Sequence, residues 1–306
     1  KIHADLPFTL TDAQERALAD IRHDFAAGER MSRLIQGDVG SGKTVVAMLA
    51  MADVAGGGGQ SALMAPTEIL ARQHFETLSG PLSDHGVNAV LLTGRDKGLA
   101  RAEKLRALAS GAAQVAVGTH ALFQDDVNFQ RLQLAVVDEQ HRFGVAERQR
   151  LQAKGEAVHL IAMSATPIPR TLELTVYGDL DVSRIDEKPP GRTPVATRAV
   201  PMSRVEEVEV RLRDVIAQGA QAFWICPLVS ESELIDLKAA EKRAAELRQK
   251  IGPGVGLVHG KMTGPEKDAV MADFADGKIS LLVATTVVEV GVNVPNATIM
   301  VIENAE

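Results

Sequence analysis

The chain has 306 residues, enough for two domains of ordinary size, and 45% of them are hydrophobic while only 3% are aromatic. Its net charge of −7 excludes a protein coated with basic surface, although local basic patches can still bind nucleic acid. No apolar run approaches the roughly 18 residues that a membrane helix needs, and the first residues lack the apolar stretch of a signal peptide, so we expect a cytoplasmic protein with no membrane partner.

The first part of the chain alternates short apolar runs with helical patterns. Runs that are apolar along their whole length and separated by helices are typical of a parallel sheet covered on both faces. Helices are predicted at 45–51, 69–78 and 99–109, and the first of them ends at the four glycines 56–59. Strands are predicted at 34–36, 61–65, 89–93, 115–118, 134–137 and 159–163.

A charged, proline-rich stretch at 186–194 interrupts this alternation and predicts a linker. Beyond it, Thr263 and Glu266 form a capping-box pattern for a helix, and the single cysteine, Cys226, is predicted to be buried because its neighbours are apolar. Strands are predicted at 195–200, 222–225, 256–259, 281–284 and 298–302, and helices at 204–218, 237–250 and 265–275. The sequence thus predicts an α/β protein with two parallel-sheet domains, residues 1–188 and 196–306, joined by a linker at 189–195.

A phosphate-binding loop is the most informative pattern in the chain. Residues 37–44 fit G-x-x-x-x-G-K-[ST], between a short apolar strand and an apolar helix. Glycines let several backbone N–H groups face one point, and the helix that follows adds the positive end of its dipole. Lys43 can then reach the β- and γ-phosphates of ATP, and the Thr44 hydroxyl can ligate Mg²⁺; a glycine-rich turn with a solvated lysine is the alternative. The predicted ATP-binding residues of the loop are Gly37, Gly40, Ser41, Gly42, Lys43 and Thr44.

Two carboxylates follow the apolar strand at 134–137, at the edge of the sheet where ligands bind in open α/β folds. Asp138 is placed to hold Mg²⁺, directly or through water, and Glu139 to orient or deprotonate the attacking water. With Lys43 they form the predicted catalytic set. Most Asp-Glu pairs are surface acids, so this inference depends on the strand that precedes the pair and on the phosphate loop about a hundred residues earlier.

A second strand end carries hydroxyl residues. Ser164 and Thr166 follow the apolar strand at 159–163. They are placed to hydrogen-bond the turn at 138–141 and to respond to the γ-phosphate. By itself this pattern is only a strand followed by a proline turn, and its weight comes from its order after the other two motifs.

A basic cluster lies around the predicted helix at 99–109. Such a cluster can contact phosphates or can be the solvated face of a helix, and the sequence leaves both open. Its members are Arg95, Lys97, Arg101, Lys104 and Arg106.

Taken in order, the phosphate loop, Asp-Glu-Gln-His and Ser-Ala-Thr resemble the motifs of superfamily 2 helicases and translocases. Longer stretches make essentially the whole chain similar to the RecG family of branched-DNA translocases, and the transcription–repair coupling factors share the same type of motor. The stretches are LPFTLTDAQ (6–14), APTEILA (65–71), DEQHRFGV (138–145), SATPIPRT (164–171) and TTVVEVGV (285–292).

The resemblance implies two RecA-like domains with ATP and Mg²⁺ in the cleft between them, which close on ATP and open after hydrolysis. It implies a monomeric motor that remodels branched double-stranded DNA in recombination and repair, with Gln14 pairing with the adenine. The implied DNA-binding residues suit phosphate contacts that ignore sequence; they are Pro66, Thr67, Gly94, Thr119, His120, His259, Gly260, Thr285 and Thr286. The residues implied to couple the ATP site to DNA or to the second domain are Gln140, His141, Ser164, Thr166, Arg170, Glu289 and Gly291.

Three departures from the family pattern set further expectations. The family's wedge domain, which splits branched DNA, has no counterpart before Lys1, and its arginine-finger motif would follow Glu306, so the second domain is expected to be truncated. An arginine finger contributes about 10³–10⁵ in rate, so the chain alone is expected to hydrolyse ATP poorly. Asn293 stands where the family usually has aspartate, which loses a charge at that position.

Three functions compete at this stage. The ordered motif set favours an ATP-dependent DNA helicase or translocase. The expected truncation and Asn293 also fit a nucleotide-gated DNA-binding module without turnover. A phosphate-loop ATPase that acts on protein or solute explains Lys43 and Asp138, but not the elements at 259–260 and 285–286 in the second domain.

Overall fold

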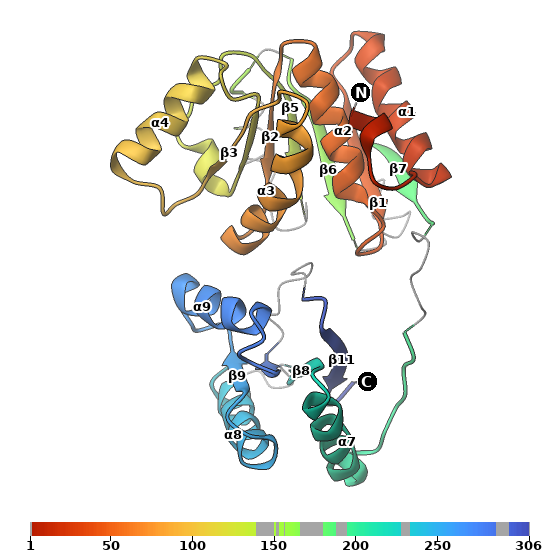
Figure 1. The fold of residues 1–306 in the computed structure, drawn as a ribbon, viewed down its shortest axis with the longest axis vertical. Helices are drawn as coiled ribbons and strands as arrows, with labels where there is room; N and C mark the ends of the chain where they lie inside the picture. Colours follow the sequence, from red (N-terminus) through yellow and green to blue (C-terminus); the bar gives the residue numbers. More distant parts are fainter. Residues whose placement is uncertain are drawn as a thin grey trace. The chain divides into compact units, whose positions relative to one another are not determined.

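A computed structural model describes residues 2–138, 150, 153–155, 157–165, 180–187, 195–227, 233–285 and 294–305. The chain divides into two compact units, residues 1–193 and 194–306, which we describe separately (Figure 1). The predicted linker lies outside the described residues apart from Val195.

The first unit is a seven-stranded sheet in the order β3-β4-β2-β5-β6-β1-β7, in which every pairing of strands is parallel. The predicted strands of this unit are confirmed to within a few residues. The strands are β1 (Ser32–Gly37), β2 (Gln60–Met64), β3 (Ala89–Leu92), β4 (Val115–Gly118), β5 (Leu132–Val137), β6 (His159–Ser164) and β7 (Asp181–Ile185). The helices are α1 (Asp12–Ala27), α2 (Lys43–Gly56), α3 (Glu68–Ser83) and α4 (Gly98–Ala109), with short 3₁₀ turns at Ile2–Asp5 and His120–Phe123.

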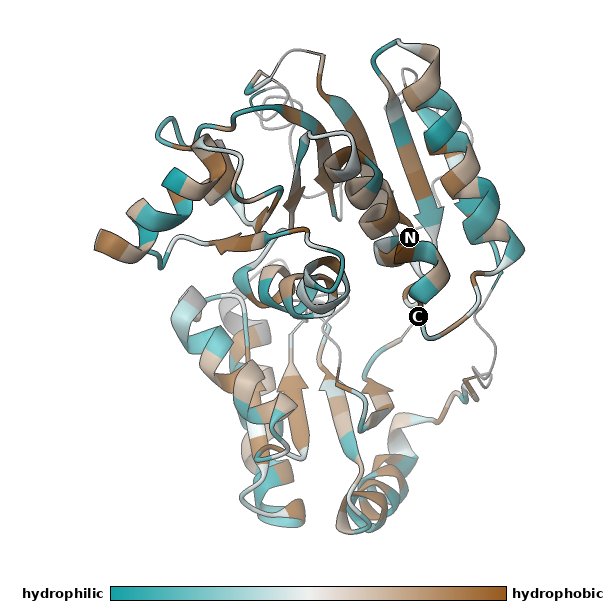
Figure 2. Cartoon of the chain, turned by 45° about the horizontal axis from the view of Figure 1, so that its top comes forward, coloured by the Kyte–Doolittle hydropathy of each residue, from teal (hydrophilic) through white to brown (hydrophobic). Residues whose placement is uncertain are grey.

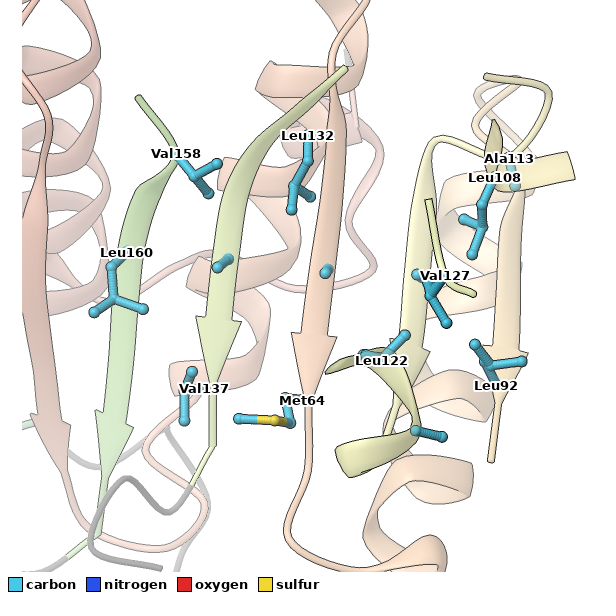
Figure 3. Close-up of a cluster of buried hydrophobic side chains, with 14 residues drawn as sticks. Met64, Leu92, Leu108, Ala113, Leu122, Val127, Leu132, Val137, Val158 and Leu160 are labelled. Atoms are coloured by element: carbon cyan, nitrogen blue, oxygen red, sulfur yellow. The ribbon is translucent and has the colours of Figure 1, made fainter. Parts of the chain in front are cut away.

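The strands carry the core because they are apolar on both faces. All five residues of β2 and the last four of β5 are buried, and Met64 and Val137 pair where these two strands end (Figure 3). Helices α1, α3 and α4 instead mix hydrophilic and hydrophobic residues along their length (Figure 2). This is the pattern expected of a parallel sheet between helical layers.

The second unit is a four-stranded parallel sheet in the order β11-β8-β10-β9. Its helices are α7 (Val205–Ala217), α8 (Glu233–Ile251) and α9 (Gly264–Ala275), preceded by a 3₁₀ turn at Met202–Arg204. Its strands are β8 (Gln221–Ile225), β9 (Val255–Val258), β10 (Leu281–Ala284) and β11 (Ala297–Ile302). The predicted fold class, two parallel-sheet α/β units with a smaller second one, is confirmed.

Two local predictions for the second unit are also confirmed. The capping box at α9 forms, since the Glu266 carboxylate accepts a hydrogen bond of 2.7 Å from the Thr263 amide. Cys226 is buried, and burial raises the pKa of its thiol to about 11.

Three elements differ from the prediction. The strand expected at 195–200 is wrong, because these six residues are exposed and pair with no strand among the residues that the structure describes. Helix α1 and strand β7 were not predicted, and both belong to the described fold. Among the helices that the structure describes, none is both long and apolar enough to cross a membrane.

Candidate nucleotide-binding and nucleic-acid-binding site

The carboxyl ends of the strands in the first unit gather nearly all of the predicted site residues that the structure describes there on one edge of the sheet. The phosphate loop follows β1, Asp138 follows β5, and Ser164 ends β6. The predicted DNA-binding residues follow β2, β3 and β4 instead. The sheet order is β3-β4-β2-β5-β6-β1-β7, so the predicted DNA-binding residues and the predicted nucleotide-binding residues occupy two halves of the edge that meet between β2 and β5. We call the half after β5, β6 and β1 the nucleotide half, after the prediction.

The phosphate loop is a tight turn from β1 into α2. Gly40 and Gly42 have φ angles of +76° and +90°, in the left-handed region that favours glycine. The Ser41 amide donates to the Asp38 carbonyl at 3.0 Å, and the Lys43 ammonium donates to the carbonyls of Gly37 and Asp38 at 2.6 and 2.9 Å. The lysine charge therefore lies over the loop at the start of α2.

Two hydroxyls of the loop face different surroundings. The Ser41 hydroxyl is buried, and within the described part of the chain it has no hydrogen-bond partner. A buried hydroxyl of this kind is costly unless something else satisfies it, which suits a loop that holds phosphate oxygens. Thr44 is the second residue of α2 and is half-buried.

Gln14 contacts the phosphate loop directly. Its Oε1 accepts from the Thr11 amide at 3.0 Å in the capping box of α1, and its Nε2 donates to the Ser41 carbonyl at 2.7 Å. A Cβ atom on Gly42 would lie 2.2 Å from this Nε2, so the amide occupies space that only glycine leaves open. The implied pairing of Gln14 with adenine stays a prediction; the structure adds a contact that holds the loop.

Asp138 is buried at the end of β5. Its amide donates to the Met64 carbonyl of β2 at 2.8 Å. On the side-chain side, its Oδ2 lies 2.6 Å from Nε2 of His74, a buried residue of α3. Sequence reasoning missed His74; the available signal was a lone histidine at an apolar position of the helix.

Ser164 and a small cavity complete the nucleotide half. Ser164 is buried and aligns with Gln36 of β1. Gln36 accepts a hydrogen bond of 3.1 Å from Nε of Arg184, which lies on β7. These elements border a cavity of about 220 Å³ beside the loop, lined among others by Gly37, Asp38 and Ala165.

The predicted DNA-binding residues of the first unit lie in the turns after three neighbouring strands. Pro66 and Thr67 follow β2, and Thr67 is the N-cap of α3, with its hydroxyl accepting from the Leu70 amide at 3.4 Å. Thr119 and His120 follow β4, and only His120 is exposed. Gly94 comes two residues after the end of β3.

The Gly94 turn is held by a carboxylate. Burial acts to raise the pKa of Asp96, but hydrogen bonds from Lys104 and from the Thr93 amide outweigh it and lower that pKa. The Thr93 amide donates to Asp96 at 2.7 Å. Asp96 therefore stays ionised and fixes the turn in which Gly94 lies.

In the second unit, the described members of the predicted DNA-binding set again follow strands. His259 and Gly260 come after β9, and Thr285 is a buried residue after β10. The Nδ1 atom of His259 is buried, and no partner for it exists in the described part of the chain. The Gly260 carbonyl accepts a hydrogen bond of 3.2 Å from Lys267 of α9.

The basic cluster around α4 is largely paired with acids. Arg95 lies 3.2 Å from Glu68. Arg101 and Lys104 are paired with Asp126 and Asp96 respectively. These pairs reduce the positive potential of this surface, so the cluster is weaker evidence for a nucleic-acid contact than its sequence suggested.

Several predicted residues lie outside the described part of the chain, so their placement stays a prediction. They are Glu139, Gln140, His141, Thr166, Arg170, Thr286, Glu289, Gly291 and Asn293.

The donors at the loop suit Mg²⁺ bound with a nucleotide. Within the described residues, no group of three or more His, Cys, Asp or Glu side chains could hold a metal ion. Mg²⁺ does not need such a cage, because it is commonly held by one or two protein oxygens together with phosphates and water. Asp138 and Thr44 supply oxygens of that kind, and the Ser41 hydroxyl, which has no hydrogen-bond partner among the described residues, lies in the loop between the strand and Thr44.

Comparison with known proteins identifies the family. Residues 11–175 match the model of the DEAD/DEAH box helicases, and residues 207–306 match the helicase conserved C-terminal domain. The chain belongs to the DEAD/DEAH box helicase family. Within this helicase family, the expected similarity to RecG is confirmed over the whole chain.

Two curated relatives illustrate that similarity. The chain is 51% identical to the ATP-dependent DNA helicase RecG of Escherichia coli (strain K12), over 100% of this chain and 45% of that protein. It is 48% identical to RecG of Thermotoga maritima, over 98% of this chain and 39% of that protein. This helicase chain therefore spans less than half the length of the curated relatives it matches.

Solved structures agree with this assignment. A structure of RecG bound to a three-way DNA junction superposes with a TM-score of 0.85 at 44% identity, covering 98% of this chain and 39% of that one. Dbp5 of S. cerevisiae, bound to RNA and ADP BeF₃, superposes with a TM-score of 0.69 at 18% identity, covering 98% of this chain and 76% of that one. The second likeness supports the helicase fold alone.

Proposed function

We propose that this chain is the motor of an ATP-dependent DNA helicase or translocase that remodels branched DNA, such as stalled forks and Holliday junctions, in recombination and repair. The observation that carries the proposal is the phosphate loop on the same edge of the sheet as the buried Asp138, within a chain about half identical to RecG helicases along its whole length. We expect a monomer in the cytoplasm, where the DNA of a bacterial relative lies.

In this proposal the residues of the nucleotide half bind and orient ATP. Lys43, at the start of α2, neutralises charge on the β- and γ-phosphates, and the loop amides and the Ser41 hydroxyl bind phosphate oxygens. Thr44 and Asp138 would hold Mg²⁺, which neutralises the charge that develops on the phosphates. Glu139 would orient the attacking water or take its proton.

The turns after β2, β3 and β4 would hold the DNA backbone. Hydroxyls and backbone amides bind phosphates without reading bases, which suits a motor that must step along any sequence. The residues after β9 and β10 would make the corresponding contacts in the second unit. ATP binding and hydrolysis would change the grip of the two units on DNA in alternation.

The test is DNA-dependent ATP hydrolysis by the whole natural protein that contains this chain. Phosphate release is measured without DNA, with linear duplex and with a three-way junction, and we expect the junction to stimulate it most. Glu139→Gln should keep nucleotide binding, measured with a fluorescent ATP analogue, and block release. A rate indifferent to all three DNA conditions contradicts the helicase proposal, and DNA binding gated by ATP without any turnover identifies a non-hydrolysing module.

A further inference from the structure

Helix α3 has a histidine in its buried stripe. The buried residues of this helix are Leu70, Ala71, His74, Leu78 and Leu82, a spacing that puts them on one face. Four of the five are apolar, and His74 is buried among them. A buried imidazole is costly unless its nitrogens are hydrogen-bonded, so its partner determines why it is there.

That partner is Asp138. His74 Nε2 and Asp138 Oδ2 are 2.6 Å apart, and both side chains are buried. The backbone of Asp138 is fixed separately by the hydrogen bond from its amide to the Met64 carbonyl of β2. Asp138 is therefore held by β2 through its backbone amide and by α3 through one oxygen of its carboxylate.

We propose that His74 is a positioning residue for the metal–nucleotide site: its Nε2–H fixes one oxygen of Asp138 and thereby sets the direction of the carboxylate toward Mg²⁺. This inference rests on the proposed function of Asp138 and deepens it. An imidazole with a proton on Nε2 donates to the carboxylate in either charge state of the ring, so the role needs no titration. Side chains that orient metal ligands in this way typically change metal affinity about 10–100-fold when they are removed.

The competing explanation is a histidine that only fills and satisfies the core. Both explanations predict some loss of stability when His74 is replaced. Only the positioning role predicts a loss specific to Mg²⁺, and only it predicts rescue by a side chain that returns an N–H to the position of Nε2. Glutamine can reach that position, whereas asparagine is one carbon shorter.

The experiment titrates MgCl₂ against the whole natural protein with fluorescently labelled ADP, and repeats the nucleotide titration in EDTA. His74→Asn should weaken the apparent Mg²⁺ affinity about 10–100-fold and leave nucleotide binding in EDTA within about twofold of the wild type. His74→Gln should restore Mg²⁺ affinity to within about threefold. Thermal unfolding of each variant confirms that the protein compared is folded.

The matched control is His85→Asn. His85 also lies against a carboxylate, with its Nε2 2.8 Å from Asp5 Oδ2, just beyond the end of the same helix. Neither His85 nor Asp5 belongs to the nucleotide half, so His85→Asn should leave the Mg²⁺ titration and the nucleotide titration in EDTA unchanged.

The outcomes distinguish a failure of the proposed metal site from a failure of the proposed role of His74. A wild-type protein whose nucleotide binding ignores Mg²⁺ overturns the proposed metal site and the role of His74 with it. If the wild type needs Mg²⁺ and His74→Asn needs it equally, only the positioning role is overturned. Equal losses in Mg²⁺ and in EDTA, or a His74→Gln variant as weak as His74→Asn, assign His74 to the core instead.

Discussion

The two units build one framework around corresponding strands, β2 and β8, and place different acids at the end of the strand beside each of them. Gln60 begins β2, and its Nε2 donates to carbonyls at the end of α4 and before β4, at 2.8 and 2.7 Å. Gln221 begins β8 and donates in the same way to the end of α9 and the loop before β10, at 2.5 and 2.7 Å. The strand orders β3-β4-β2 and β9-β10-β8 correspond as well.

The correspondence extends along the chain. Residues 88–119 and 254–285 align without a gap, so that β3, α4 and β4 match β9, α9 and β10. After each helix the chain turns at a left-handed glycine, Gly111 with φ +75° and Gly277 with φ +77°. The same backbone solution therefore appears twice, with little identity between the side chains that surround it.

The difference lies in the acid that follows the neighbouring strand. Asp138 donates its amide to β2, and Glu303 donates its amide to β8 at the matching position. The Glu303 carboxylate pairs with the guanidinium of Arg243 and accepts from Trp224 Nε1 at 2.8 Å. A guanidinium is always charged and neutralises the glutamate, whereas a histidine fixes Asp138 without a permanent charge. One framework thus carries a structural ion pair in one unit and a candidate metal ligand in the other.

The largest expected effect is on ATP turnover, and it distinguishes a lysine of the first unit from a lysine of the second. Lys43→Ala removes the ammonium that lies over the phosphate loop, and we expect ATP turnover to fall by about 10²–10³-fold or more. Lys278→Ala, an exposed lysine paired with Asp273 and Asp276 in the second unit, should leave turnover unchanged. Steady-state phosphate release measures both. A Lys43→Ala variant with normal turnover would remove the functional contrast between the units.

Replacing Asp138 and Glu303 by the corresponding amides tests whether the two matching positions have different roles. Asp138→Asn should lower turnover by about a hundredfold through lost charge at the metal site. Glu303→Gln should leave nucleotide binding intact and destabilise the second unit by about 1–3 kcal/mol, because the half-buried Arg243 then loses one of its carboxylate partners and keeps Glu246 and the more distant Glu209. Urea unfolding followed by Trp224 fluorescence reports the second unit. Equal effects of the two changes on nucleotide binding would contradict the assignment.

The shared framework predicts similar costs for its two glutamines. Gln60→Leu and Gln221→Leu each remove two hydrogen bonds to backbone carbonyls, and Gln60→Leu also removes the one that its Oε1 accepts from the Arg131 amide at 2.8 Å. Each change should therefore destabilise its own unit by about 1–3 kcal/mol. Hydrogen exchange resolved by mass spectrometry reads the two units separately. Gln249→Leu, at an exposed position of α8, is the control and should change little. If only one of the two changes destabilised its unit, the two glutamines would share a geometry without contributing equally to stability.

The smallest effect concerns Cys226, whose counterpart in the first unit is Ala65. Each follows its central strand, and their amides donate to Ala284 and Gly118 at 2.8 and 2.9 Å. Cys226→Ala should therefore cost less than about 1 kcal/mol, measured by urea unfolding.

The thiol of Cys226 has a pH signature of its own. Its folded pKa of about 11 lies above the ordinary value of 9.0, so the neutral thiol adds stability that is complete below about pH 9 and is lost as pH rises through 11. At pH 8 iodoacetamide should label the folded protein about a hundredfold more slowly than the unfolded one. Equal labelling rates would show an accessible thiol.

Most of the sheet was predictable because its strands are buried on both faces and therefore apolar throughout. β7 escaped prediction because polar contacts hold it, with the buried Arg33 of β1 donating to Ser183 of β7 at 2.9 Å and to Asp24 of α1 at 2.7 Å. The opposite error occurred at 195–200, where a strand was predicted because the alternation of strands and helices restarts after the linker, but within the described part of the chain no strand pairs with these residues. Hydrophobic patterns in a sequence therefore predict buried apolar strands well, and they predict strands held by polar contacts poorly.

The candidate site was predictable where a motif sets both residue and backbone. The phosphate loop and Asp138 lie where the sequence placed them, at the ends of β1 and β5. His74 was not predictable in this way, because its role depends on a partner 64 residues away on another element. The acid pairs of the α4 cluster were hidden for the same reason, since charge along the chain says nothing about which opposite charges lie across a turn.

Because Gln14 lies so close to Gly42, a substitution at either position changes which residues the other position can accept. Alanine at 42 would need the left-handed backbone and would also displace the amide at position 14. A shorter side chain at position 14 removes the clash with a Cβ atom at position 42 and leaves only the cost of the left-handed backbone. The single mutant that shortens residue 14 should therefore accept alanine at 42 more easily than the wild type does. A lineage that changes one of these residues thereby changes which replacements the other can accept.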